Sequence, residues 1–576
     1  MIERPFYLFF VPLGFLVKCC DETQFMLEHR SPFYLLDYDK CGSRSALILP
    51  LHHYLLTTTC KPRGVDSTPR QPCRFSVYWL GKYISAEGFP PIPSLFLLKS
   101  LTPLIVSLRV VLSPSHLGIG PRLTRHTSSK MISPPSSILI IGSGVFGLST
   151  AHSLATNPTY SQTTITVIDR HPFPSPDGSS IDSSRIIRSD YSSPLYAELA
   201  SKAQKAWRET ELGEDERYSE SGLLLTCERE KEGAEYVQKS YRNVREIFGE
   251  GNVVECTSNE EVKRMAATGG GSGSYGYLNK ASGWANAEAA MVFLRRKVEA
   301  LNRVNLLVGT VTSLSYSSDL STVTGATLSS GEVLTADLTI LAAGAWTPTL
   351  LDLSGRAEAT GQVIAYLRLS SSEQKRLENI PVMLSFTSGM FIIPPRNNVL
   401  KIARHAYGYL NPVCIPHPDP EVRQSNPDAV LEVSVPMTSH NTPGLWIPKE
   451  GEEACRQCIR EMVPWLSHRP FEHTRICWYS DTPEGDFLVD YHPQYKGLFL
   501  ATGGSGHAFK FLPVIGEEVV GVLEGKVEKE GIRGLWKWRD KKVEGGRLMQ
   551  GDGSRSGTPG LILDELLKKD KRVARL

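Results

Sequence analysis

Acidic residues are missing from a long stretch of this 576-residue chain, although the chain as a whole is electrically balanced. No aspartate or glutamate occurs between Glu87 and Asp169, yet 63 Lys and Arg face 61 Asp and Glu overall, for a net charge of +2. This balance excludes a general electrostatic attraction to nucleic acid or to an anionic membrane surface. The sequence therefore predicts no nucleic-acid partner.

Cysteine is also scarce. The 11 cysteines are too few and too irregularly spaced for a disulfide scaffold, and the paired spacings of zinc sites do not occur, so no metal site is predicted. Cys455 and Cys458 have the C-x-x-C spacing, but the surrounding EACRQCIREMV is typical of a helix. Two buried helix cysteines are therefore predicted there, and not a redox motif.

Long uninterrupted hydrophobic runs are lacking as well. The apolar segment 95–112 contains Lys99, Pro103 and Arg109, which argues against a membrane span. Residues 1–130 have no sustained helical or strand period, and 122–130 is basic and rich in Ser and Thr, like a transit peptide placed internally. We expect this region to be a poorly ordered extension outside the fold, or upstream sequence that does not belong to the native protein, with Met131 as the functional start.

A short strand, a glycine turn and a helix follow one another in SILIIGSGVFGLSTAHSL, residues 137–154. Gly142 permits the tight turn, Gly144 lets backbone N–H groups approach a pyrophosphate, and Gly147 lets the helix pack on the strand. A second strand ends at Asp169, whose carboxylate can accept hydrogen bonds from ribose hydroxyl groups. The order of these elements predicts a dinucleotide-binding site.

The remaining patterns predict a mixed α/β protein. The expected elements are helices at 194–209 and 285–301, strands at 305–313, 323–328 and 338–341, β-rich segments at 363–404 and 431–435, and a flexible connection at 268–274. The strand at 338–341 runs into Ala-Ala-Gly344, an arrangement found beneath the cofactor in flavoproteins with two dinucleotide folds.

Four further motifs follow the glycine turn along the chain. They are DSSRIIRSDY at 182–191, LKIARHAYG at 400–408, RICWYSDTPEGDFLVD at 475–490 and ATGGSGHAFKFLPVIGE at 501–517. With the glycine turn, they resemble the FAD-dependent amine oxidases, which include monomeric sarcosine oxidase, pipecolate and saccharopine oxidases, and fungal fructosyl amino acid oxidases. The resemblance covers about 131–525 and implies a flavoprotein oxidase.

The resemblance implies an α/β architecture, a Rossmann-like FAD fold of two dinucleotide-binding domains with an interleaved antiparallel-sheet substrate domain. The cofactor domain is then discontinuous along the chain. The expected segments are an extension at 1–130, FAD-binding parts at 131–225, 276–360 and 475–525, substrate-domain parts at 226–275 and 361–474, and a C-terminal tail at 526–576.

The resemblance also implies roles for individual side chains. Cys477 matches a cysteine that forms a thioether with FAD, so covalently bound FAD is expected. Arg188 and Lys510 match positions that bind the substrate carboxylate, which a guanidinium can do bidentately. Arg185 matches a cation beside the flavin, and Lys401 matches a lysine proposed to promote oxygen reduction.

His405 and His507 match histidines near the flavin, where they tune substrate protonation or ring electrostatics. The implied catalytic residues are Lys401, His405 and Arg185. The residues expected to bind the cofactor are Gly142, Gly144, Val145, Phe146, Gly147, Asp169, Arg170, Ser184, Arg185, Gly344, Cys477, Gly504, Gly506, His507 and Lys510.

Each of these residues also has a purely structural alternative. The two arginines of RIIR could form surface or interdomain salt bridges. Lys401 and His405 could lie on the wet face of a strand, Cys477 could be a buried structural thiol, and His507 could cap a helix. Lys510 lies in the apolar stretch AFKFL, where an unpaired charge is costly, and this favours a ligand there.

The expected reaction oxidises the C–H next to a secondary amine of a small amino acid, with O₂ as the electron acceptor and H₂O₂ as a product. Three alternatives are a flavin dehydrogenase with another acceptor, a nicotinamide enzyme with the same turn, and a flavoprotein-like binding module without turnover. Sarcosine, pipecolate, saccharopine and fructosyl amino acids all stay open as substrates, because Arg188 and Lys510 specify only a carboxylate.

The chain ends in Ala-Arg-Leu at 574–576, which has the small, basic, leucine form of the peroxisomal address Ser-Lys-Leu. A peroxide-producing oxidase would suit that compartment, and the cytoplasm is the alternative. A monomer without a stable membrane span is expected.

Overall fold

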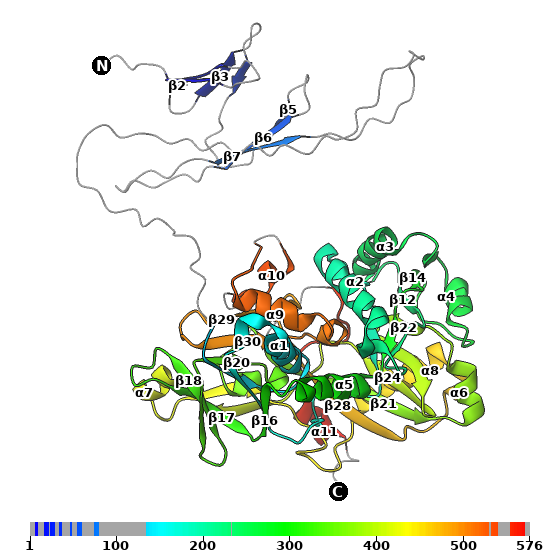
Figure 1. Ribbon diagram of the computed structural model, residues 1–576. Coiled ribbons are helices and arrows are strands. Elements are labelled where there is room, and N and C mark those ends of the chain that lie inside the picture. Colours follow the sequence, from blue (N-terminus) through cyan, green and yellow to red (C-terminus); the bar gives the residue numbers. More distant parts are fainter. Residues whose placement is uncertain are drawn as a thin grey trace, which may run out of the picture. The chain divides into compact units, whose positions relative to one another are not determined.

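The structure of the protein is a computed structural model that describes residues 134–231, 233–528, 531–539 and 553–570, together with short strands nearer the N-terminus (Figure 1). The chain divides into two units, Met1–His126 and Thr127–Leu576. Two antiparallel sheets occur in the first unit, one of β1 (Phe6–Phe9), β2 (Leu16–Asp21), β3 (Gln24–Glu28) and β4 (Tyr34–Leu36), the other of β5 (Ala46–Ile48), β6 (Tyr54–Thr59) and β7 (Arg74–Trp79). The rest of the expected extension, with Met131, lies outside the described residues.

The second unit contains a six-stranded sheet of the dinucleotide-binding type. Its strand order is β16 (Val304–Val308), β9 (Thr164–Asp169), β8 (Ser137–Ile141), β20 (Leu338–Leu341), β30 (Leu498–Thr502) and β29 (Leu488–Tyr491). The first five strands are parallel, and β29 is antiparallel to β30. Parallel strands covered on both faces need apolar sequence throughout, which SILII of β8 and LFLAT of β30 provide. The discontinuous Rossmann-like fold is confirmed.

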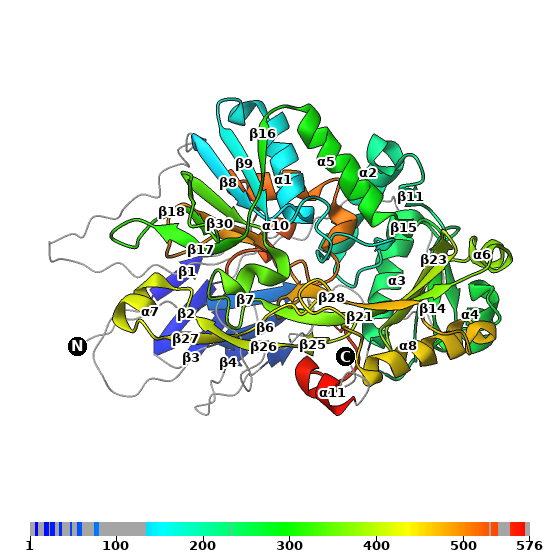
Figure 2. The ribbon, with the colours of Figure 1, turned by 90° about the horizontal axis from the view of Figure 1, so that it is seen from below.

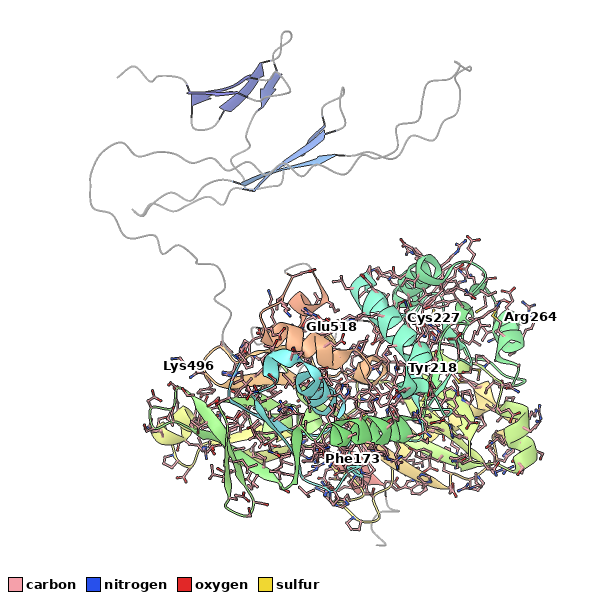
Figure 3. All side chains as sticks on the ribbon, in the orientation of Figure 1. Phe173, Tyr218, Cys227, Arg264, Lys496 and Glu518 are labelled. Atoms are coloured by element: carbon pink, nitrogen blue, oxygen red, sulfur yellow. The ribbon has the colours of Figure 1, made fainter. Side chains whose placement is uncertain are left out.

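Helices cover this sheet (Figure 2). Helix α1 (Val145–Thr156) contacts both α5 (Ala287–Ala300) and α9 (Ile515–Leu523), and their apolar faces share one core with β8 and β30. Glu518 of α9, labelled in Figure 3, forms ion pairs of 3.0 Å with Lys202 and 2.8 Å with Arg533. These pairs join α9 to α2 (Pro194–Glu209) and α10 (Ile532–Leu535).

A ten-stranded sheet forms the second layer. Along it follow β13 (Val253–Cys256), β14 (Tyr275–Asn279), β12 (Leu223–Cys227), β22 (Val382–Ser385), β23 (Met390–Arg396), β24 (Val399–Arg404), β21 (Glu358–Arg368), β25 (Tyr409–Leu410) and β31 (Leu561–Ile562), with β28 (His473–Asp481) also paired to β21. All pairs are antiparallel except β12 with β22 and β25 with β31. The antiparallel sheet expected beside the cofactor domain is thus present.

Both faces of this sheet are buried. In β12, Leu224 packs on one side with α4 (Asn259–Ala266) and α8 (Lys449–Met462), whereas Leu223 and Leu225 pack on the other with α3 (Ala234–Phe248). Alternation of this kind follows from the two-residue period of a strand.

Smaller elements complete the unit. They are the sheets β10 (Arg185–Ile187) with β15 (Gly283–Ala285) and β11 (Tyr218–Ser219), β17 (Val311–Tyr316) with β18 (Val323–Leu328) and β19 (Val333–Thr335), and β26 (Pro412–Pro416) with β27 (Val430–Ser434), and the helices α6 (Ser371–Leu377), α7 (Pro420–Ser425) and α11 (Leu563–Lys569).

Two segments differ from the sequence expectation. The glycine-rich stretch 268–274 is not a loose connection, because Thr268 is buried and its hydroxyl donates to Met462 O at 2.5 Å. A Cβ on Gly270 would lie 2.1 Å from Glu461 O, so glycine serves close packing against α8 here. The C-terminal region expected as a tail supplies β31 to the large sheet.

Cys455 and Cys458 are buried on α8, as predicted, and burial raises the pKa of Cys455 to about 12. None of the described helices combines the length and the apolar character needed to cross a bilayer. In the described part of the chain, no group of three metal-ligating side chains comes together.

Candidate flavin and substrate site

The glycine turn between β8 and α1 has the shape that a dinucleotide requires. Gly142 has a φ of +108°, and a Cβ there would lie 2.5 Å from Ala342 O. A Cβ on Gly147 would lie 1.9 Å from Gly142 O, so only glycine allows the helix to lie this close to the turn. Gly144 caps α1 without a side-chain hydrogen bond, which leaves the positive helix N-terminus to an anionic ligand. Val145 N donates to Ser180 Oγ at 3.1 Å.

Asp169 stands at the end of β9, beside this turn. Ser143 donates to its Oδ2 from the backbone N at 2.8 Å and from Oγ at 2.7 Å, and the other carboxylate oxygen takes no part in these bonds. The next residue, Arg170, pairs with Asp177 at 2.6 Å and lies 3.4 Å above the ring of Trp346. Asp169 thus stands beside the turn, bonded by Ser143 through Oδ2, and Arg170 holds the neighbouring loop through Asp177.

Other expected cofactor positions lie around the same turn. Phe146 is buried and its ring meets that of Phe487 edge to face. Gly344 has a φ of +56° and open space where a Cβ would stand. Gly506 has a φ of +71°, and a Cβ there would lie 2.3 Å from the ring of Tyr479, whereas Gly504 lies against Phe146.

Cys477 lies on β28, with 2% of its surface exposed. Arg185 Nη2 is 3.5 Å from its Sγ, and Arg185 also forms an ion pair with Asp182 and donates to Ser179 O at 2.8 Å. The structure therefore brings the expected thioether cysteine and the expected flavin-side cation together, although they are far apart in sequence.

Lys401 joins the same cluster from β24. Its side chain is 3% exposed, which rules out the wet face of a strand, and Nζ donates to Asp182 Oδ2 and to Ser184 O, both at 2.7 Å. Tyr366 OH donates to the other oxygen of Asp182 at 2.9 Å. Burial lowers the pKa of Lys401 to about 8, against the opposing charge of Asp182. Burial alone would raise the pKa of Asp182, but Lys401 and Arg185 hold it well below its ordinary value.

Arg188 and Lys510 form a second cluster, in which the buried Asp190 acts on both cations electrostatically but forms no ion pair with either. Neither cation has a carboxylate within ion-pair distance in the described part of the chain, and Arg188 Nη1 is buried without a hydrogen-bond partner. The guanidinium lies over the rings of Tyr191 and Phe386, 4.9 and 5.7 Å from their centroids. Burial holds the pKa of Lys510 well below its ordinary value, and Arg188 lowers it further. Two buried cations without an ion-paired acid are costly, and an anionic ligand would lower that cost.

A hydrogen-bonded chain runs from Lys510 to His507. Lys510 Nζ donates to Tyr191 OH at 2.8 Å, and Tyr191 OH is 2.8 Å from His507 Nδ1. His507 Nε2 is 2.7 Å from Gly485 O, which can only accept, so the proton is on Nε2 and Nδ1 accepts from Tyr191. Burial, with Lys510 nearby, holds the pKa of His507 well below its ordinary value. Its side chain caps no helix.

His405 follows β24 and is also neutral. Its Nε2 lies 3.4 Å from Ser554 Oγ. Burial holds its pKa well below the ordinary value, and the charges of Arg555, Arg188 and Lys510 add to this effect.

Several residues of these clusters were not assigned from sequence. Asp182 and Tyr191 lie inside the first motif, and the i, i+3 spacing of Asp182 and Arg185 was the available signal. Asp481 lies inside the motif at 475–490, whereas Tyr366 and Arg555 lie in no recognised pattern, and only the folded chain brings these three to the site.

Comparison with known proteins agrees with this geometry. Residues 137–521 match the family described as DAO, FAD dependent oxidoreductase. The amino acid oxidase imqH of Aspergillus flavus is 34% identical over 471 residues, which cover 70% of this chain and 98% of that protein. L-saccharopine oxidase of Schizosaccharomyces pombe is 30% identical over 70% of this chain and 93% of its own.

The crystal structure of fructosamine oxidase (Amadoriase II) from Aspergillus fumigatus matches with a TM-score of 0.63 at 30% identity, over 74% of this chain and 95% of that one. The matched residues contain the glycine turn and all four motifs. The chain therefore belongs to the DAO family of FAD-dependent oxidoreductases.

Proposed function

We propose that this enzyme is an oxidase of secondary amino acids, of the sarcosine, pipecolate, saccharopine or fructosyl amino acid type. The observation that carries the proposal is the pair of buried cations Arg188 and Lys510, which lack an acidic partner within ion-pair distance in the described part of the chain. The names of the relatives, amino acid oxidase and L-saccharopine oxidase, support the same substrate class.

The residues of the site fit FAD. The Gly142 turn and the N-terminus of α1 would hold the pyrophosphate, Asp169 would hold the adenosine ribose, and Cys477 would hold the ring through a thioether. The close Cβ contacts at Gly142 and Gly147 support this assignment, because they show that the turn leaves no room for a side chain at these two positions. When bound, FAD supplies the acceptor for a hydride equivalent from the carbon next to the amine and returns the electrons to O₂, which gives H₂O₂.

The substrate carboxylate is bound by Arg188 and Lys510. Both cations are desolvated, so a carboxylate placed between their N–H groups restores the interactions that water would have made. The same positive charges, with Arg185 and Lys401, disfavour the ammonium form of the substrate amine. The neutral amine is the form that gives up a hydride, so no strongly basic side chain is required, and the imine product hydrolyses in water.

Lys401 serves the oxygen half of the reaction. Its ammonium group spends two of its three N–H groups on Asp182 and Ser184 O, which fix its position. A preplaced positive charge stabilises negative charge that develops as oxygen is reduced, without reorganisation at that moment.

The test is a panel of sarcosine, L-pipecolate, L-saccharopine and fructosyl glycine with a peroxide readout, run on the chain begun at Met131 and on the full chain. We expect peroxide with at least one of them, and a yellow colour that stays with the denatured protein. Cys477→Ser should lose that colour on denaturation, whereas Cys458→Ser, a buried cysteine of α8, should keep it.

Three results would contradict the proposal. A protein that stays colourless after flavin reconstitution would remove the cofactor assignment. Substrate oxidation with a dye but without oxygen consumption would make the enzyme a dehydrogenase. Colour without turnover of any amine would make the protein a flavin-binding module without catalytic activity.

We further propose that the enzyme is a monomer and acts in the peroxisome. The C-terminal Ala574, Arg575 and Leu576 support the address, and they lie outside the described residues. A fluorescent protein ending in these residues should collect in peroxisomes, and a diffuse signal would instead indicate the cytoplasm as the location. Light scattering on the purified chain tests the monomer.

A further inference from the structure

The C-terminal segment 553–570 enters the candidate site, although the sequence suggested only a tail. Ser554, Arg555 and Ser556 are each at most 4% exposed. Tyr407 N donates to Ser556 O at 3.1 Å, and β31 then adds to the large sheet beside β25. Of the three buried side chains, Ser556 Oγ has no hydrogen-bond partner among the described residues and Ser554 Oγ lies 3.4 Å from His405 Nε2, whereas the Arg555 guanidinium is well paired.

Arg555 has three such partners. Nη2 donates to Asp481 Oδ1 at 2.7 Å and to Ser505 O at 2.9 Å, and Nη1 donates to Ala406 O at 3.1 Å. Asp481 is completely buried, and its second oxygen accepts from Thr360 Oγ1. The ion pair is thus fully enclosed and its acid is satisfied from both sides.

The three partners belong to three segments that carry the candidate flavin and substrate residues. Asp481 ends β28, the strand of Cys477. Ala406 follows His405 in the loop after β24, the strand of Lys401. Ser505 lies in the glycine loop that leads to His507 and Lys510.

A guanidinium suits this task because its donors form a rigid planar fork. Bonds in fixed directions to three backbone or carboxylate oxygens define the relative placement of the segments that carry them. Ser554, the neighbouring residue, lies 3.4 Å from His405 Nε2 and extends the same contact.

We propose that Arg555 is a positioning residue, which fixes β28, the loop after β24 and the glycine loop relative to one another and makes the C-terminal segment a working part of the active site. The link to catalysis rests on the proposed function, whereas the mechanical link does not.

Amide hydrogen exchange on the full-length protein tests the mechanical link. We expect Arg555→Met to speed exchange in 404–408 and 503–507 by about tenfold or more, because the loops lose their common anchor. Arg555→Lys keeps the charge but not the fork and should have an intermediate effect. The control is Arg217→Met, which removes a buried arginine held by Leu212 O at 3.0 Å and Glu211 O at 2.6 Å. This control should leave both loops unchanged.

Unchanged exchange in both loops of Arg555→Met would overturn the proposal, and so would an equal rise in Arg217→Met, since that would reflect general loss of stability. If Arg555→Met does not fold, Asp481→Asn removes the charge of the partner and keeps its shape, and the same two loops should exchange faster. Exchange needs no substrate, so a wild-type protein without oxidase activity would sink the proposed function and leave this result standing.

The catalytic link has its own readout. With a substrate of the panel, Arg555→Met should lower kcat by about tenfold or more while KM changes less, because Arg188 lies in none of the three segments and keeps its place, whereas the reacting groups lose alignment. Arg555→Lys should recover part of kcat. A change confined to KM would show that Arg555 contacts the substrate and would refute the positioning role.

Discussion

At the scale of single residues, the buried charges of the site fall into sets that differ in how they are balanced. Arg185 and Lys401 share Asp182, whereas Arg188 and Lys510 have no acid within ion-pair distance in the described structure. A buried cation without an acid is costly unless a ligand supplies the anion. The lack of an ion-paired acid at Arg188 and Lys510 therefore supports the proposal that they bind the substrate carboxylate.

Replacing Arg188 by Ala should raise KM for the amino acid by about 30-fold or more, since a hydrogen bond to a charged group is worth about 1.5–3 kcal/mol and two can form here. Flavin content should be unchanged, because the Arg188 guanidinium lies over the rings of Tyr191 and Phe386, away from the glycine turn and Cys477. Arg188→Lys should recover part of the affinity. Steady-state kinetics and the visible spectrum measure both quantities, and an unchanged KM would remove the role.

Replacing Lys401 by Met should slow reoxidation of the reduced flavin by about 10²-fold or more, with a much smaller effect on anaerobic reduction by substrate. The reason is that the proposed role of Lys401 in the oxygen step falls to this one charge. Its effect on the substrate amine, in contrast, is shared with Arg185, Arg188 and Lys510. Stopped-flow absorbance separates the two half-reactions. Equal losses in both would show that Lys401 acts on the site as a whole.

The same residue predicts a pH dependence. Burial lowers the pKa of Lys401 to about 8, so its ammonium form disappears as the pH rises through that value. The rate constant of the oxygen reaction in the wild type should therefore fall between about pH 7 and pH 9. Lys401→Met should show no such fall, and an identical profile in both proteins would assign the titration to another group.

The sequence motifs located the cations but not their partners. Arg185, Arg188, Lys401 and Lys510 occur in recognisable motifs, and each of these cations is buried or partly buried in the site. The acid of Lys401 lies 219 residues away at Asp182, and such a pairing depends on how two sheets meet. No local pattern contains that information.

At the scale of elements, the sequence predicts where helices and strands lie along the chain, but it does not predict which of them pair or pack together. The helix predicted at 194–209 is α2, and the buried strand at 338–341 is β20. Strand β28 was expected within the cofactor domain, but it pairs with β21 in the large sheet. Its sequence, HTRICWYSD, has an apolar run at the centre and no alternation that would assign it to one sheet, so only the fold decides.

The contact between α1 and its turn predicts a sharp effect of one methyl group. Gly147→Ala places a Cβ 1.9 Å from Gly142 O, so the helix must move away from the turn. We expect a loss of about 3 kcal/mol or more in the free energy of unfolding, together with loss of flavin. Gly251→Ala is the matched control, because a Cβ there meets nothing within 4 Å. Its stability should change by less than about 0.5 kcal/mol.

At the scale of the whole molecule, the two sheets meet where three distant parts of the chain converge. Cys477, Lys401 and Arg185 come from β28, β24 and β10, and Asp182 lies between them. Building the site this way requires burial of histidines and lysines whose pKa values are lowered from their ordinary range. That requirement has a consequence for stability.

The folded protein should be more stable at pH 8.5 than at pH 5.5. His405 and His507 have pKa values well below 6.5 because of burial and neighbouring cations, so the unfolded chain binds protons that the folded chain refuses as the pH falls through 6.5. Asp182 acts in the same direction at lower pH, because its pKa lies below the ordinary 3.8 and its contribution is lost on acidification. Lys401 adds stability as the pH rises from about 8 toward 10.5.

Each of these effects makes the folded protein more stable as the pH rises, and calorimetry can measure their sum. We expect Tm at pH 8.5 to exceed Tm at pH 5.5 by about 2 °C or more. A double variant, His405→Gln with His507→Gln, removes two of the groups that titrate near pH 6.5 in the unfolded chain. It should reduce the difference in Tm between the two pH values. If Tm were higher at pH 5.5, the two histidines would bind protons in the folded state, and the hydrogen-bonded chain from Lys510 through Tyr191 to a neutral His507 could not exist as described.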